Sequence, residues 1–389
     1  MAFQYQIVIL DPGATGGRAD RLRATLQRRL EDLGIDLSSA VSFLDSASFS
    51  QRDPKSPIVG VYFGGPDQSP ADTATIDQLL ALPAIVIPVV ETLEGYSELV
   101  PDTLKPINGC APKAGDTGLE SIAGLVLEAL SLLRQSRRLF ISYRRVESRG
   151  IALQLYAMLD ERGFDVFLDT HGVRPGEPFQ EVLWHRLADS DVVVLLDSPE
   201  FLESQWTAKE LAEASTMGIG ILQLIWPRHE RARTTELAFP HYLTRLDFDP
   251  IGSSGSQSRL AYDTAQQVVT EVESLRARSL QARYQALVRS FCKAAKDAGI
   301  EATVQPERFI LTRKGTDEQV AVIPAIGVPT ALQIQEIANL FAPAKRRAFL
   351  IYDHVGIRDR WIAHLRWLDD HLPVKTFRAS DSAEWLARL

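Results

Sequence analysis

Apolar residues between positions 138 and 226 form short continuous runs separated by amphipathic stretches. RLFISY (138–143), FDVFLD (164–169), DVVVLLD (191–197) and GIGILQLIW (218–226) predict strands, because continuous apolar runs suit a parallel sheet covered on both faces. IALQLYAMLDERG (151–163) has helical periodicity, and Gly163 is suited to end that helix. A weaker strand near 242–248 and a long helix over 261–280 complete this middle unit. The alternation of strands and helices predicts a doubly wound parallel α/β sheet.

Two further α/β units flank the middle one. Residues 1–135 repeat its pattern in degenerate form, with QIVIL, VSFLD and IVGVYFG at the corresponding strand positions. Residues 285–389 predict a small α/β domain: the strands FILTRKG and QVAVIPA, then helix, strand, helix, strand and a short last helix. We therefore expect three domains, at 1–135, 136–280 and 285–389.

The overall composition mainly excludes classes of protein, such as secreted and membrane-spanning ones. The chain has 389 residues and a net charge of −8, so overall charge does not argue for nucleic acid, although residues 280–389 are mildly basic. The start, MAFQYQIVIL, lacks a signal-peptide pattern, and no apolar run reaches the roughly 18 residues that span a bilayer. Cys110 and Cys292 fit no metal or redox spacing, and we expect a cytoplasmic protein without a membrane partner.

Three motifs of the middle unit carry a resemblance in combination. They are the first strand RLFISYRR, the second strand with its loop FLDTHGVRPGEPF, and the helix start SQWTAKEL (204–211), which reads Ser-x-Trp-x-x-x-Glu. In this order and at this spacing, residues 136–280 resemble a bacterial Toll/interleukin-1 receptor (TIR) domain. The resemblance implies a flavodoxin-like fold. It also makes the N-terminal unit a degenerate TIR-like copy, without the Ser-x-Trp-x-x-x-Glu motif.

Many TIR domains cleave NAD⁺ at the nicotinamide–ribose bond, and the resemblance places their catalytic glutamate at Glu210. A carboxylate can stabilise the oxocarbenium-like ribose that forms when nicotinamide leaves. Trp206, one turn earlier on the same predicted helix face, would stack on the cationic nicotinamide. Each residue also has a plain structural interpretation, a solvated glutamate and an indole packed on the sheet. The family's usual Cys after the Trp is Thr207 here, which affects packing and not catalysis.

The resemblance implies further substrate-binding positions. Arg144 could bind the pyrophosphate as a bidentate donor, or be a surface residue of an Arg-Arg pair. Asp169 ends a predicted strand, and the loop 171–179 matches the family's BB loop, which gates the pocket and makes domain contacts. The expected substrate-binding set is Ser142, Tyr143, Arg144, Asp169, Val173, Arg174, Gly176 and Trp206. We expect no metal and no cofactor, with NAD⁺ as the substrate.

The C-terminal unit resembles restriction-endonuclease-like domains in its element order. Those enzymes hold a divalent metal with an Asp and a Glu-x-Lys at the hairpin. The strand VAVIPAIG has neither an acid nor a Lys, so the resemblance implies an inactive domain.

The sequence therefore favours a TIR-domain NAD⁺ glycohydrolase that releases ADP-ribose or a cyclic form. The family resemblance implies an anti-phage defence effector activated by self-association, with flanking domains that recognise a trigger or partner protein. Two alternatives stay open: a TIR scaffold without turnover, and a nucleic-acid sensor that acts through the C-terminal domain.

Overall fold

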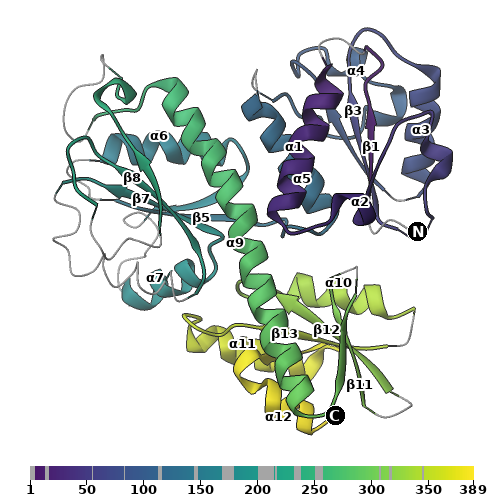
Figure 1. Cartoon of the computed structure of the whole chain (residues 1–389), viewed down its shortest axis with the longest axis vertical. Helices are drawn as coiled ribbons and strands as arrows, with labels where there is room; N and C mark the ends of the chain where they lie inside the picture. Colours follow the sequence, from purple (N-terminus) through teal and green to yellow (C-terminus); the bar gives the residue numbers. More distant parts are fainter. Residues whose placement is uncertain are drawn as a thin grey trace. The chain divides into compact units, whose positions relative to one another are not determined.

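The computed structural model forms two compact units, Met1–Gln135 and Ser136–Leu389 (Figure 1). It describes residues 5–13, 17–54, 56–82, 84–112, 116–143, 148–168, 179–199, 214, 217–231, 238–249, 257–305, 308–314, 318–343 and 346–389. No helix in these ranges is both long and apolar enough to cross a membrane.

The N-terminal unit is a four-stranded parallel sheet with helices on it. Its strands are β1 (Tyr5–Leu10), β2 (Val41–Leu44), β3 (Ile58–Phe63) and β4 (Ile85–Val89), in the order β2-β1-β3-β4. Its longer helices are α1 (Arg18–Asp32), α3 (Pro70–Ala81) and α5 (Asp116–Ala129), and the short α2 (Leu37–Ala40) and α4 (Tyr96–Leu99) lie in connections. Helix α3 starts where the sequence provides a cap, since the Ser69 hydroxyl accepts from the Asp72 N–H and Pro70 takes the first turn.

The second unit begins with a five-stranded parallel sheet. Its strands are β5 (Arg137–Ser142), β6 (Phe164–Leu168), β7 (Val192–Asp197), β8 (Gly220–Ile225) and β9 (Phe239–Tyr242), in the order β6-β5-β7-β8-β9. The first four follow the same order as the N-terminal sheet, so the repeated sequence pattern is matched by a repeated topology. The flavodoxin-like doubly wound sheet predicted for this region is confirmed.

Helices cover both faces of this sheet, as its apolar strands require. One core cluster joins the sheet to α6 (Arg149–Asp160) and to the first half of α9 (Tyr262–Asp297). The other joins it to α7 (Phe179–Ala188), on the opposite face (Figure 1). Helix α6 is followed by Gly163 in the left-handed conformation, with φ of 76°, as predicted for a helix end.

The C-terminal part is a mixed five-stranded sheet. Strands β10 (Glu301–Val304), β11 (Ile310–Lys314) and β12 (Glu318–Ala325) are antiparallel, and β13 (Arg347–Tyr352) and β14 (Lys375–Arg378) continue the sheet in parallel. Helices α10 (Ala331–Phe341), α11 (Asp359–His371) and α12 (Ser382–Ala387) complete it. The α/β elements expected here are present, and the short, largely exposed β10 is a strand that the sequence did not predict.

Two element boundaries differ from the sequence predictions. Helix α9 continues 17 residues past Leu280, to Asp297, because apolar side chains at Tyr284, Leu287 and Phe291 extend its buried face onto the C-terminal core. The weak strand expected near 242–248 lies instead at Phe239–Tyr242. It is an edge strand, a position that tolerates Pro240.

Candidate functional site

The carboxyl ends of parallel strands are where ligands bind in open α/β sheets. The register of the middle sheet places Ser142 beside Leu195 and Asp197 beside Ile225, so β5, β7 and β8 end close to one another. The polar residues that end β5 and β7, Ser142 and Asp197, therefore lie at one edge, which is the candidate ligand site.

Ser142 and Tyr143 are the predicted site residues that the structure describes. Ser142 is 4% exposed and, by strand alternation, points to the same face as Phe140, the face that α7 covers. Tyr143 is 5% exposed and belongs to the core cluster on the other face, with Ile151 and Leu196. The two residues lie at the expected edge, on opposite faces of the sheet.

The other predicted site residues lie outside the described ranges, and their roles stay predictions. They are Arg144, Asp169, Val173, Arg174, Gly176, Trp206 and Glu210.

Both ends of the chain segment that carries Trp206 and Glu210 are anchored in the core. Ser198, directly after β7, is fully buried, and Ala214 is helical and 1% exposed. The Ile219 N–H donates to the Ala214 carbonyl at 2.9 Å across Gly218, whose φ is 66°. A glycine in this conformation is typical of the residue that follows a helix.

A buried polar cluster lies at the same edge, on strands β7 and β8. Asp197 and Gln223 are both fully buried, and the Gln223 amide donates to Asp197 Oδ2 at 2.7 Å. His229 Nε2 lies 3.0 Å from Asp197 Oδ1, and Arg231 Nε donates to Gln223 Oε1 at 2.9 Å. These contacts connect the end of β7 to the loop after β8.

The Asp197 carboxyl group of this cluster has a perturbed pKa. Burial raises the pKa of Asp197, while the hydrogen bond from Gln223 and the positive charge of His229 and Arg231 oppose the rise. The His229 side chain is 15% exposed and so connects the buried carboxyl group to the surface.

This cluster was not predicted from the sequence, although one signal for it was present. Gln223 interrupts the apolar run GIGILQLIW, and a polar side chain inside a buried strand needs a hydrogen-bond partner. The partner could not be read from the sequence, because Asp197 and Gln223 meet only through the strand register.

No group of three or more His, Cys, Asp or Glu side chains in the described ranges is placed to hold a metal ion.

Comparison with known proteins assigns this region to a family. A family model described as TIR domain matches residues 139–249. A Brachypodium distachyon protein named probable 2′ cyclic ADP-D-ribose synthase BdTIR is 34% identical over 74 residues, which cover 19% of this chain and 33% of that protein. The chain thus matches about one third of the length of this curated relative.

Similarity to solved structures is weak. A two-component response regulator/GGDEF domain protein is 14% identical with a TM-score of 0.29, covering 69% of this chain and 97% of its own. The tagatose-6-phosphate ketose/aldose isomerase of Escherichia coli is also 14% identical, with a TM-score of 0.19 and coverage of 73% and 83%. Neither likeness carries an argument about this chain. The family match and the parallel sheet in the order β6-β5-β7-β8-β9 together identify residues 139–249 as a TIR domain.

Proposed function

We propose that the TIR domain cleaves NAD⁺ at the bond between nicotinamide and ribose, with Glu210 as its catalytic carboxylate. The observation that carries the proposal is the family match over 139–249, which includes a Ser-x-Trp-x-x-x-Glu motif at 204–210. The similarity to a plant protein named as a cyclic ADP-ribose synthase supports the same substrate.

The reaction needs few groups from the protein. Nicotinamide leaves as a neutral molecule with the electron pair of its bond to ribose C1′, and the ribose becomes an oxocarbenium-like cation. The Glu210 carboxylate stabilises this charge. Water adds to C1′ and loses a proton, which gives ADP-ribose, or an atom of the ADP-ribose moiety takes the place of water and gives a cyclic product.

The test is nicotinamide release from NAD⁺ by concentrated purified protein. Glu210→Gln keeps the size and hydrogen-bonding shape of the side chain and removes its charge, and it should lower kcat by roughly a hundredfold or more. Glu213→Gln, three residues later, is the matched control and should retain activity. Equal activity of the wild type and Glu210→Gln would show that Glu210 is not the catalytic group.

We further propose that activity requires self-association through TIR domains, with the flanking domains responding to a trigger or partner in anti-phage defence. The specific rate should then rise with protein concentration. Absence of turnover at every concentration, with correctly folded protein, would favour the scaffold alternative. Trp206→Leu should mainly raise KM, because the proposed stacking contact would be present in the ground state as well as the transition state.

A further inference from the structure

The TIR domain and the C-terminal domain are joined by more than a shared helix. The buried Val328 N–H donates to Asp189 Oδ1 at 3.0 Å, directly after α7. Arg283 of α9 donates to the Ala188 and Ser190 carbonyls at 3.1 and 2.9 Å. These bonds satisfy backbone groups at the end of α7, so the junction has a defined geometry.

The loop before α11 also approaches the TIR domain closely. Gly356 has a φ of 75°, and a Cβ atom there would lie 3.0 Å from the Ala188 Cβ and 2.5 Å from the Met217 Cε. His185 of α7 stacks on Trp361 of α11, with ring centroids 5.2 Å apart and planes 15° from parallel. The walls formed by α7 and by residues 356–361 are thus fixed against each other.

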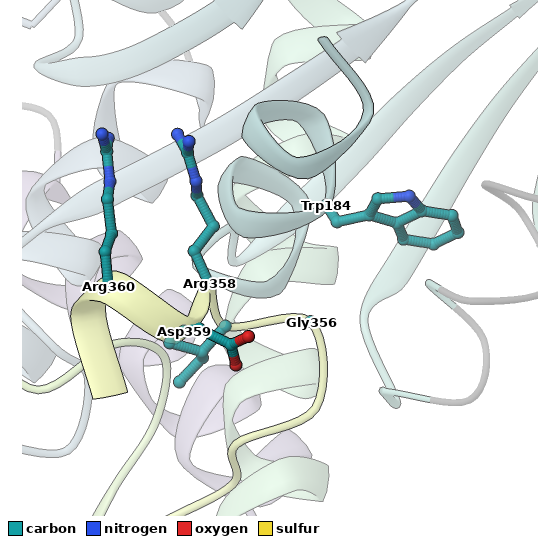
Figure 2. Close-up of a pocket in the computed structure, with 6 residues that line it drawn as sticks. Trp184, Gly356, Arg358, Asp359 and Arg360 are labelled. Carbon is teal, nitrogen blue, oxygen red and sulfur yellow. The ribbon is translucent and has the colours of Figure 1, made fainter. Parts of the chain in front are cut away.

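A pocket of about 310 Å³ lies at this junction, lined by Trp184 of α7 and by residues 356–360. This volume is at the lower end of the range for small-molecule sites. Figure 2 shows the Arg358 and Arg360 side chains extended in the same direction, with the Asp359 carboxylate on the other side of the chain. Two guanidinium groups therefore reach out together, and the carboxylate between them in sequence does not lie between them in space.

Positive charge is concentrated around this pocket. Burial is the main cause that lowers the pKa of His185 to about 4, and neighbouring cations lower it further. These cations are Arg186, Arg358, Arg360 and Arg138. The nearby acid Asp189 already forms an ion pair with Arg138 and accepts from Val328. A bound anion would be attracted by this positive charge.

We propose that the junction pocket binds a phosphate-bearing small molecule through Arg358 and Arg360. Guanidinium groups present planar pairs of N–H donors that match the oxygens of a phosphate, and two of them can hold adjacent phosphates. A pocket of this size accepts a pyrophosphate or the phosphates of one nucleotide.

The site is separate from the NAD⁺ crevice proposed above. Ala188 and Met217 precede strands β7 and β8, so the junction lies toward the amino ends of the strands, whereas the crevice lies at their carboxyl ends. Binding at the junction does not depend on the proposed enzymatic activity and can be measured without NAD⁺.

The test is calorimetric titration of the full chain with inorganic pyrophosphate and with ATP. Arg360 is exposed, so Arg360→Gln should fold normally and should weaken binding of either probe by about tenfold or more. Arg358→Gln should do the same. Arg366→Gln, an exposed arginine later in α11 that does not line the pocket, is the matched control and should bind as the wild type does.

Two further measurements separate the possible results. Binding should raise the pKa of His185 above its value of about 4, since an anion counteracts the surrounding arginines; NMR follows this shift, with His185→Gln as the assignment control. If a 5′-phosphorylated oligothymidine binds the wild type and not Arg360→Gln, the phosphate site is supported. The bound phosphate would then come from the end of a nucleic acid. Failure of pyrophosphate, ATP and this oligonucleotide to bind, or binding unchanged in both arginine variants, would overturn the proposal.

Discussion

The ion pair between Arg276 and Asp191 is expected to be a main determinant of how helix α9 is held on the TIR sheet. Both side chains are 0% exposed, and Arg276 Nε donates to Asp191 Oδ2 at 2.7 Å. Arg276 Nη2 also donates to the Ser136 carbonyl at 3.4 Å. Arg276→Met keeps most of the side-chain volume but leaves the Asp191 carboxylate buried without this cation.

Removal of one partner from a buried pair typically costs about 3–5 kcal/mol in the free energy of unfolding. A domain is stable by only about 5–15 kcal/mol, so the midpoint of urea unfolding, followed by circular dichroism, should fall strongly. Lys293→Met is the control on the same helix. It removes an exposed pair with Asp297, whose side chains are 78% and 64% exposed, and should leave the midpoint unchanged.

A double variant tests the physical reason. Arg276→Met combined with Asp191→Leu replaces both charges with apolar side chains, and it should be more stable than Arg276→Met alone. A midpoint for Arg276→Met equal to that of Lys293→Met would refute the reasoning, as would a double variant less stable than the single one.

Three further predictions concern the junction and two histidines. In urea unfolding, Gly356→Ala should lower the free energy of unfolding by about 1–3 kcal/mol more than Gly299→Ala. Both glycines have a positive φ, but of the two only Gly356 lacks space for a Cβ atom. Equal losses would contradict the close approach of Gly356 to Ala188 and Met217. His185, whose pKa is lowered to about 4, should be neutral by NMR at about pH 5.5. The free energy of unfolding should fall as pH drops from about 6.5 toward 4, because in this range only the unfolded chain protonates His185. An NMR titration midpoint near 6.5 would refute the lowered pKa. The hydrogen bond that His241 donates to the Glu271 carboxylate raises the pKa of His241, so its stabilisation is complete below about pH 6.5 and is lost as pH rises through the folded pKa. Glu271→Gln should therefore destabilise the protein more at about pH 5.5 than at about pH 8.5, and the opposite trend would contradict the assignment.

Local patterns in the sequence were sufficient to predict most of the fold. The run DVVVLLD is apolar throughout because β7 is covered on both faces, and Gly163 marks the turn after α6 because its φ is positive. The spacing of apolar residues also indicates that α9 continues, since Tyr284, Leu287 and Phe291 keep the helical spacing after Leu280.

Contacts between distant parts of the chain could not be predicted in the same way. His185 and Trp361 are ordinary helix residues in the sequence, and only the tertiary structure stacks them. Gly356 has no turn motif that reveals its contact with Ala188 and Met217. The candidate site is divided similarly: the family motif points to Glu210, whereas the link between Asp197 and His229 depends on the sheet register and on the loop after β8.

The most direct test of the central claim compares nicotinamide release by the wild type, Glu210→Gln and Glu213→Gln at one high protein concentration. The account predicts turnover by the wild type and by Glu213→Gln, with a loss of roughly a hundredfold or more in Glu210→Gln. Turnover by Glu210→Gln at the wild-type rate would contradict the account and move the search for the catalytic group elsewhere along the edge, beginning with Asp197 and His229.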